Sequence, residues 1–452
     1  MYIYSSQDIS AKIKIMSSRC CVHVKEAVVI GPCKPTPNHI LQLSALDSQL
    51  FVRFTFEYLL VYKPRCGSFD KATVTDNVKS ALGRALVPYY PLAGRVRARP
   101  DGSGLEVVCR GQGAVFISAV SDSTAASDFD GAPCRRAMWR KFLSFHVADV
   151  LKGGPPLVVQ LTWLSDGGAT LAVGFNHCLC DGVGSGEFLN SFADLAIGKQ
   201  GLVGLDPKPI SGRHLLDPIS SFCVSRDDNS LSHPEFRSVP DVSGFASRFV
   251  RERLMPTSVI FEQNELDGLK KLTRVATFTS FEILAAHVWR SWARGLNLPS
   301  DQIVKLVFSV NIRQRVNSRL PSGYYGNAFV LGCAEARAGE LAGKGLRHAA
   351  ELVKGAKERV GDEYVREVVE LVSWNRASVD SVGVLIMTQW SRLGLESVDF
   401  GIGRPVQVGP VCCDKYCVVL PVCGVAGAFK VNLAVPSTAV DQYLHYLRNA
   451  AA

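Results

Sequence analysis

The clearest hydrophobic pattern in the chain is a pair of apolar runs at 156–164 and 169–175. They are separated by Ser-Asp-Gly-Gly, a turn sequence that favours a β-hairpin. The second run leads directly into His177. After a glycine-rich stretch, the spacing of apolar residues over 187–197 predicts a helix.

Helix and strand patterns also alternate along the second half. Thr279 and Glu282 form a capping box ahead of the apolar positions in 283–296, which predicts a helix. Ser437 is expected to cap a C-terminal helix over 439–449. Further strands are predicted at 258–261, 303–310, 328–331, 383–387, 416–420 and 429–435, and further helices after Asn264 and at 345–360.

The middle of the chain, 198–240, is rich in Pro, Gly, Ser and Asp and has no sustained periodicity. A central stretch of this length favours an interdomain connection over a disordered loop. The 452 residues suit two domains of about 200 residues each. The sequence therefore predicts an α/β (mixed α+β) protein with domains at 17–200 and 246–452 and a crossover linker at 201–245. Residues 1–16 differ from the rest and are left out of this assignment.

Composition narrows the classes of function. Hydrophobic residues make up 47% and charged residues 20%, which is typical of a folded globular protein. The net charge of +9 is spread along the chain, and the basic clusters at 95–99 and 135–141 do not form the interleaved aromatic platform that single strands need. Nucleic-acid binding is therefore not expected. The apolar runs fall short of the roughly 18 residues needed to span a bilayer, so no membrane span is expected.

The fourteen cysteines do not indicate a disulfide framework, because no apolar secretory leader opens the chain. We expect reduced thiols and a cytoplasmic protein. Cys412, Cys413 and Cys417 cluster, and Cys178 and Cys180 follow a histidine, but paired CxxC spacing does not occur. No metal site is predicted.

His177 and Asp181 stand where a buried strand ends. An imidazole, with an ordinary pKa of about 6.5, is suited to act as a general base near neutral pH. The alternative is a structural histidine closing the strand. Because Gly182 and Gly184 favour a tight turn rather than a helix, the carboxylate of Asp181 is not assumed to face the imidazole.

The glycines allow two other interpretations, and neither is supported. Gly182, Gly184 and Gly186 do not fit GxGxxG, and the preceding strand belongs to a hairpin rather than a βαβ unit. Ser185 lies between glycines but not in a GxSxG nucleophile elbow.

The segment from His177 to Gly182, His-Cys-Leu-Cys-Asp-Gly, resembles the HxxxD signature of the plant BAHD acyltransferases, which are related in fold to chloramphenicol acetyltransferase. Asp399-Phe-Gly-Ile-Gly403 resembles the family's DFGWG motif, with Ile402 in place of tryptophan, which puts only the local packing near the coenzyme tunnel in doubt. Other blocks that resemble the family lie at 33–37, 43–47, 86–95, 281–290, 311–315, 323–327 and 388–390. The resemblance spans roughly residues 25–450.

The resemblance implies two similar-sized domains with the active-site channel between them. His177 would be the general base, taking the acceptor's proton as it attacks the thioester directly, without an acyl-enzyme. Trp390 and Thr388 are the implied donors to the oxyanion of the tetrahedral intermediate.

A structural part of the motifs is implied as well. It comprises Asp181, Gly182, Arg313, Asp399, Gly401 and Gly403. Asp181 is expected to anchor the turn through an ion pair with Arg313, and Asp399 to serve as a structural ion-pair partner.

The resemblance also implies the ligands. Ser280 and Lys271 are expected to contact coenzyme A, and acyl-CoA serves as co-substrate with no bound cofactor. The segments 51–64 and 86–95 look most like the alcohol-acylating branches, so the expected acceptor is a small-molecule hydroxyl and the donor acetyl-, benzoyl- or hydroxycinnamoyl-CoA. A monomer is expected. Alternatives are an amine acceptor, a non-catalytic binding protein of the same fold, and a condensation-domain-like enzyme, which usually carries a second histidine where this chain has Asn176.

Overall fold

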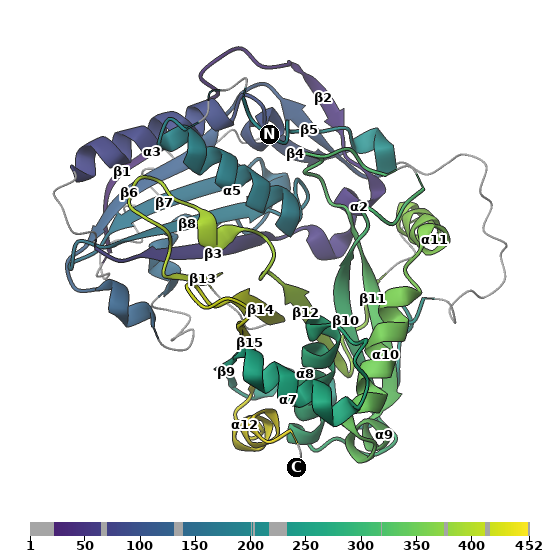
Figure 1. The fold of residues 1–452 in the computed structure, drawn as a ribbon. Coiled ribbons are helices and arrows are strands. Elements are labelled where there is room, and N and C mark those ends of the chain that lie inside the picture. Colours follow the sequence, from purple (N-terminus) through teal and green to yellow (C-terminus); the bar gives the residue numbers. More distant parts are fainter. Residues whose placement is uncertain are drawn as a thin grey trace.

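Two six-stranded sheets organise the chain, the first built mainly from the N-terminal half and the second from the C-terminal half (Figure 1). The computed structural model describes residues 22–64, 70–130, 139–199, 201, 204–216, 233–317, 319–374, 378–411 and 416–450. The first sheet has the strand order β1-β6-β7-β8-β3-β13 and the second β11-β10-β12-β14-β15-β9. Both are mixed sheets with helices packed on them, so the predicted α/β class is confirmed.

The first sheet contains the predicted hairpin. Its strands are β1 (Val22–Ile30), β6 (Ala114–Ser121), β7 (Leu157–Trp163), β8 (Ala169–Asn176), β3 (Thr55–Tyr62) and β13 (Gln407–Pro410). β7 and β8 pair antiparallel, with Trp163 opposite Ala169, and every residue of both strands is buried. Helices α3 (Lys71–Ala85) and α5 (Gly182–Ala196) pack together on this sheet. The continuous apolar runs in the sequence follow from this burial on both faces.

Strand β13 belongs to the C-terminal half but completes the first sheet. It pairs antiparallel with β3, where Gly409 lies opposite Leu59. The two sheets therefore do not follow a simple division of the chain. The domain boundaries at 17–200, 201–245 and 246–452 stay a prediction.

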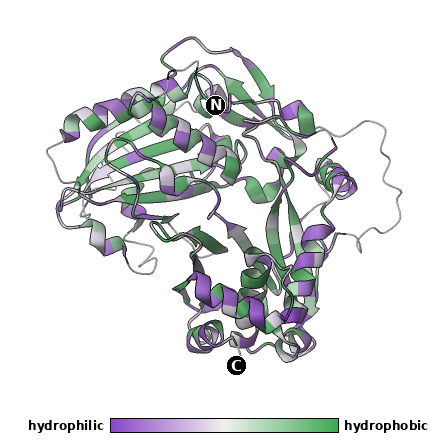
Figure 2. Ribbon diagram, viewed as in Figure 1, coloured by the Kyte–Doolittle hydropathy of each residue, from purple (hydrophilic) through white to green (hydrophobic). Residues whose placement is uncertain are grey.

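The second sheet is covered by helices on one face (Figure 1). Its strands are β11 (Phe329–Arg337), β10 (Ile303–Asn311), β12 (Val384–Gln389), β14 (Cys417–Pro421), β15 (Phe429–Pro436) and β9 (Leu254–Phe261). The helices of this half are α6 (Phe245–Arg251), α7 (Gln263–Thr273), α8 (Ser280–Gly295), α9 (Ala338–Gly343), α10 (Leu346–Glu358), α11 (Asp362–Ser373) and α12 (Val440–Arg448). Figure 2 shows hydrophobic strands against helices that mix hydrophilic and hydrophobic residues, as expected for amphipathic helices on a sheet.

The two predicted helix caps have different outcomes. Thr279 accepts the backbone N–H of Glu282, so the capping box of α8 is confirmed. The cap by Ser437 is wrong, because α12 has Ala439 at its N-cap and no side-chain cap. Ser437 lies just beyond β15, where its N–H donates to the carbonyl of Arg253 over 2.9 Å.

The described residues of the region between the halves, 204–216 and 233–240, have more order than the composition of the region predicts. A 3-10 turn covers Arg213–Leu216, Ile210 bridges Tyr324 in parallel, and the side chains of Arg213 and His233 are buried. A small sheet of β2 (His39–Gln42), β5 (Leu105–Cys109) and β4 (Arg95–Ala98) and the short helix α2 (Ala45–Ser48) complete the N-terminal half. Residues 1–16, 135–138 and 217–232 and Cys412 and Cys413 lie outside the described residues. Within the described part, no helix is long and apolar enough to cross a membrane.

Candidate active site

His177 follows the last residue of β8, at the edge where the first sheet meets the second half of the chain. Its N–H donates to the carbonyl of Phe54 over 2.8 Å. The next N–H, of Cys178, is held by the side-chain oxygen of Asn176 at 3.2 Å. These bonds fix the backbone on both sides of the histidine, and its side chain is half-buried.

Asp181 begins helix α5. Its carboxylate accepts the N–H of Gly184 over 2.9 Å, which satisfies one of the free donors at the helix N-terminus. The helix starts at Gly182, so the predicted tight turn over Gly182 and Gly184 is wrong. The glycines serve close packing instead, because a Cβ at position 184 would lie 2.1 Å from the carbonyl oxygen of Tyr325.

Arg313 forms the ion pair with Asp181 that the resemblance implies. Its Nη1 and Nη2 lie 2.8 and 2.9 Å from the two carboxylate oxygens, and the N–H of Ala328 donates to the same carboxylate over 3.0 Å. Burial by itself raises the pKa of Asp181, but the charge and hydrogen bonds of Arg313 outweigh it and lower the pKa. Asp181 is thus an ionised anchor between α5 and the segment that enters β11.

The imidazole of His177 is oriented by Asn327. Nδ1 of His177 lies 3.0 Å from Oδ1 of Asn327. The Asn327 Nδ2 donates to Asp47 Oδ1 over 2.8 Å and to the carbonyl of His177 over 2.7 Å, which fixes the orientation of the amide. Because an amide oxygen only accepts, Nδ1 carries the hydrogen and Nε2 keeps its lone pair. Burial lowers the pKa of His177 despite this bond and the charges of Asp181 and Asp47, so the ring is a neutral base near pH 7.

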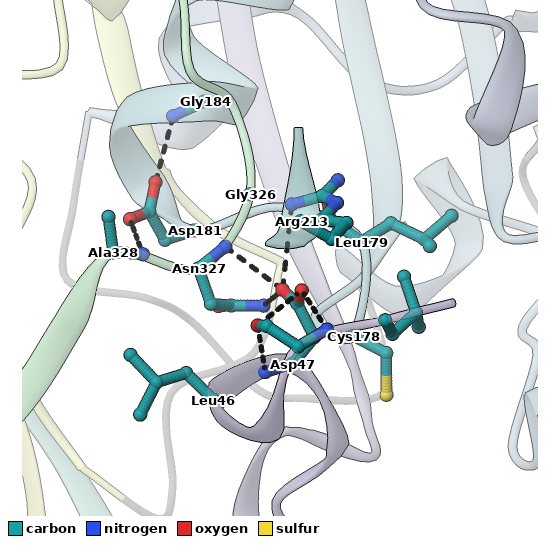
Figure 3. A network of polar contacts seen from close by, with 12 residues as sticks. Leu46, Asp47, Cys178, Leu179, Asp181, Gly184, Arg213, Gly326, Asn327 and Ala328 are labelled. Atoms are coloured by element: carbon teal, nitrogen blue, oxygen red, sulfur yellow. Dashed lines mark hydrogen bonds and ion pairs between the residues drawn. The ribbon is translucent and has the colours of Figure 1, made fainter. Parts of the chain in front are cut away.

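Asp47 is fully buried and is held on three sides (Figure 3). It closes a capping box with Ser44 at the start of α2 and accepts both the backbone and side-chain N–H groups of Asn327. Asp47 and Asn327 lie in the motifs at 43–47 and 323–327, but the sequence predicts no role for either residue. The Ser44-Ala-Leu-Asp47 segment carries a recognisable capping pattern, whereas nothing local brings position 47 to position 327.

Three phenylalanines surround His177. The ring centroids of Phe54, Phe56 and Phe329 lie 5.3, 4.8 and 5.7 Å from that of the imidazole. Phe56 is buried, whereas Phe54 is 39% exposed and Phe329 half-buried. The base therefore sits among apolar groups, two of which are open to solvent.

Trp390 lies in the same aromatic layer as His177. Its ring is 4.7 Å from that of Tyr58, which is 5.4 Å from Phe56 beside the histidine. The Tyr58 hydroxyl lies 2.8 Å from the Ser185 hydroxyl, which donates to the carbonyl of Gly182. Ser185 is therefore a fully buried structural residue. Trp390 is buried too and belongs to the first hydrophobic core.

Thr388 lies on β12, two residues before Trp390, and is half-buried. Thr388 and Ile386 are two positions apart on the strand, so their side chains share one face. Ile386 is 40% exposed, which shows that this face is turned away from the helices. The neighbouring Met387 points into the helix-covered core instead.

Asp399 holds the backbone of its own motif. Its carboxylate accepts the N–H groups of Gly401 and Gly403 at 2.8 and 2.9 Å, and within the described residues it makes no ion pair. Its ion-pair role stays a prediction, and among the described residues Asp399 shapes a turn in which both glycines have positive φ. Ile402 is buried in the first hydrophobic core, where an aliphatic side chain packs well.

The two residues expected to contact coenzyme A lie on neighbouring helices of the second half. Ser280 is half-buried at the first position of α8, and Lys271 is exposed in the last turn of α7. The α7 and α8 helices contact each other.

The thiols near His177 are poor nucleophiles. Cys178 and Cys180 are buried, and burial raises the pKa of Cys178 to about 12 and that of Cys180 still further. Groups of His, Cys, Asp and Glu that could hold a metal ion do not occur among the described residues.

Known proteins are similar to this chain in sequence and in fold. The Transferase family profile matches residues 20–440. Omega-hydroxypalmitate O-feruloyl transferase of Arabidopsis thaliana is 33% identical over 437 residues, covering 93% of this chain and 92% of the relative. Alcohol acyl transferase 1 (allele GSa) of Malus domestica is 35% identical over 405 residues, covering 86% of this chain and 85% of the relative.

Solved structures agree on the fold. TRI101 of F. sporotrichioides, complexed with coenzyme A and T-2, is 14% identical and superposes with a TM-score of 0.74 over 90% of this chain and 97% of that one. The family match and these relatives define an acyltransferase. The chain belongs to the Transferase family, the BAHD acyltransferases, and is an acyl-CoA-dependent O-acyltransferase.

Proposed function

We propose that this enzyme transfers an acyl group from coenzyme A to the hydroxyl of a small apolar acceptor, with His177 as general base. One observation carries the proposal: the bond from His177 Nδ1 to Asn327 leaves Nε2 unprotonated and available to the substrate. An amide held by a buried carboxylate performs this orientation without being able to take the proton itself.

The reaction proceeds by direct attack. His177 Nε2 removes the proton of the acceptor hydroxyl as its oxygen attacks the thioester carbonyl, a contribution of about 10²- to 10⁴-fold in rate. The C–S bond of the tetrahedral intermediate then breaks, and the imidazolium returns its proton to the thiolate of coenzyme A. The raised pKa values of Cys178 and Cys180 support a mechanism without an acyl-cysteine.

Trp390 and Thr388 are proposed as donors to the oxyanion. The support for Trp390 is its place in the aromatic layer that also contains His177. Thr388 is supported by its half-exposed position on the face of β12 that the helices leave open. A preorganised donor at this point is worth about 10²- to 10³-fold in kcat.

Coenzyme A is proposed to bind with Ser280 and Lys271 near its phosphates. The free N–H groups at the start of α8 and the ammonium of Lys271 are both suited to anions. The fold of this chain resembles that of a protein solved with coenzyme A, which supports a coenzyme site in the fold.

The acceptor is proposed to be an apolar alcohol. Phe54 and Phe329 present partly exposed rings beside the base, and an alkyl or aryl group buries more apolar surface there than a sugar does. The names of the relatives point the same way, since they mention omega-hydroxypalmitate and alcohols. The feruloyl group in the first name supports a hydroxycinnamoyl donor, beside acetyl and benzoyl.

We also propose a monomeric, cytosolic enzyme with the domain boundaries given above. The cysteines of the described residues are all free thiols, which supports a reducing compartment.

The test is thiol release from a panel of acyl-CoAs with long-chain, short-chain and aromatic alcohols and the corresponding amines. We expect turnover to be highest with an apolar alcohol and to fall at least about 10²-fold in His177→Ala. Preference for amines would contradict the hydroxyl acceptor, and release of thiol in stoichiometric amount before an acceptor is added would contradict direct attack.

A further inference from the structure

A buried arginine from the region between the halves contacts two of the groups that hold His177 in place. Arg213 is 1% exposed, and its Nη2 donates to the carbonyl of Leu179 over 2.6 Å. Its Nη1 lies 3.6 Å from Oδ1 of Asp47 (Figure 3). One guanidinium group therefore contacts both the 177–181 turn and the carboxylate that orients Asn327.

The segment that carries Arg213 is fixed by the chain around residues 323–326. Ile210 forms a parallel bridge with Tyr324, and its N–H donates to the carbonyl of Gly323 over 2.8 Å. The guanidinium lies over the ring of Tyr325, 5.0 Å from its centroid. These contacts hold the arginine in one direction, toward the interior.

Position 326 shows how closely the guanidinium fits. A Cβ at Gly326 would lie 1.4 Å from Nη1 of Arg213, so only glycine leaves room for it. The next residue is Asn327. The backbone that presents Asn327 to the histidine is therefore shaped around Arg213.

We propose that Arg213 is a positioning residue for acyl transfer: it holds the Leu179 carbonyl and balances the charge of Asp47, and so fixes the place and tautomer of His177. The inference rests on the proposed role of His177 as base. It gives the linker a part in the chemistry, since a segment between the two halves sets the geometry of the catalytic group.

A positioning role and a merely structural one predict different kinetics. Among the described residues, the charges that act on His177 are the carboxylates of Asp47 and Asp181, which pair with the guanidinium groups of Arg213 and Arg313, while Arg53 acts on the neighbouring Cys178. Removing the charge of Arg213 leaves Asp47 uncompensated, which stabilises a protonated His177. A structural arginine, in contrast, changes stability and leaves the pH profile in place.

The experiment compares Arg213→Gln and Arg213→Lys with Arg95→Gln. Arg95 is a matched control, because it is also a buried arginine that donates to backbone carbonyls, those of Gly94 and Gly113 at 2.7 and 2.9 Å. In the full-length enzyme, kcat, KM for acyl-CoA, the pH profile of kcat/KM and the melting temperature are measured.

For Arg213→Gln we expect kcat to fall at least about 10-fold with little change in KM, because misplacement of a catalytic group costs rate. The ascending limb of the kcat/KM profile should move to higher pH. Arg213→Lys keeps the positive charge but loses the planar guanidinium with its several N–H donors. Its kcat should fall, while the ascending limb of its pH profile stays near that of the wild type. Arg95→Gln should lose stability and keep both kcat and the limb.

Two results would overturn the inference. One is a folded Arg213→Gln enzyme whose kcat and pH profile are those of the wild type. The other is an Arg213→Gln enzyme that loses stability as Arg95→Gln does, while the ascending limb of its pH profile stays in place. If Arg213→Gln fails to fold, wild-type kcat in Arg213→Lys overturns the inference by itself. His177→Ala separates the two proposals: an active His177→Ala contradicts the base, whereas an inactive one beside normal Arg213 variants contradicts only the positioning role.

Discussion

The Nδ1 of His177 lies 3.0 Å from the Oδ1 of Asn327, a residue 150 positions further along the chain. The bond joins the end of β8 in the first sheet to the start of β11 in the second. An amide in this place accepts the Nδ1 hydrogen but cannot become charged, so the negative charge of Asp47 acts on the imidazole from one residue further away. The arrangement fixes a tautomer while leaving the basicity of the ring to be set mainly by its burial.

Asn327→Ala should therefore impair chemistry more than binding. The imidazole loses the acceptor that holds Nδ1–H, so the fraction of enzyme with a free Nε2 in the right place falls. We expect kcat to drop about 10- to 100-fold, with KM for acyl-CoA nearly unchanged. Steady-state kinetics on the folded variant decide this, and an Asn327→Ala enzyme with wild-type kcat would show that the bond does not matter to turnover.

The pH dependence follows from the burial of His177. Its pKa is lowered, so the neutral base forms as the pH rises through a value below about 6.5. The ascending limb of kcat/KM should accordingly have a midpoint below about 6.5. The measurement is kcat/KM from about pH 5 to 8 in buffers of constant ionic strength. A limb centred well above pH 7 would contradict a desolvated histidine as the base.

Asp181 and Arg313 form a buried pair, and removing one partner leaves an unpaired charge. Asp181→Ala and Arg313→Ala should each reduce the free energy of unfolding by roughly 3–5 kcal/mol. The double variant should lose less than the sum of the singles, because neither charge is then left alone. Chemical denaturation of the four proteins of this cycle measures the coupling.

His177→Ala is the control for the pair, since it should lose turnover without this loss of stability. Asp181→Asn tests the alternative that Asp181 orients the imidazole of His177. It should be destabilised, because the amide cannot replace a carboxylate toward Arg313. A stable but inactive Asp181→Asn enzyme would show that Asp181 orients the imidazole after all.

Local features of the fold were predictable from the sequence. The hairpin ending at His177 and the capping box at Thr279 depend on neighbouring residues, and both are present. The sequence does not predict the start of α5, because glycine has a low helix propensity. Position 184 requires glycine because the backbone of Tyr325, distant in the sequence, packs against it. Strand β13 was missed because its four residues pair only with a strand from the other half of the chain.

The candidate site was predictable to a lesser extent. His177 followed from its place after a buried strand, and the Asp181–Arg313 pair only from the resemblance to a family. Asp47 and Arg213 act through contacts across many residues, and neither has a local pattern that indicates burial near a catalytic base. A single sequence gives periodicity and short motifs, whereas these contacts depend on the tertiary fold.

A last prediction concerns His233, which is 2% exposed and lies between two carboxylates. Its Nδ1 is 3.1 Å from Glu235 and its Nε2 2.9 Å from Glu367 on α11. Burial by itself lowers the pKa of His233, but the hydrogen bonds and charges of Glu235 and Glu367 outweigh it and raise the pKa. Below its folded-state pKa, His233 is an imidazolium that ties the region before α6 to α11.

A raised pKa in the folded state means that the folded protein binds more protons than the unfolded chain. The stabilisation is fully present below the unfolded pKa of about 6.5 and is lost as the pH rises through the folded value. In that window the free energy of unfolding should fall by up to about 1.4 kcal/mol per pH unit. Urea denaturation of wild type and His233→Gln at several pH values tests this, because the variant should be less stable at low pH and should lack this part of the slope. Parallel pH dependences in the two proteins would contradict a charged His233.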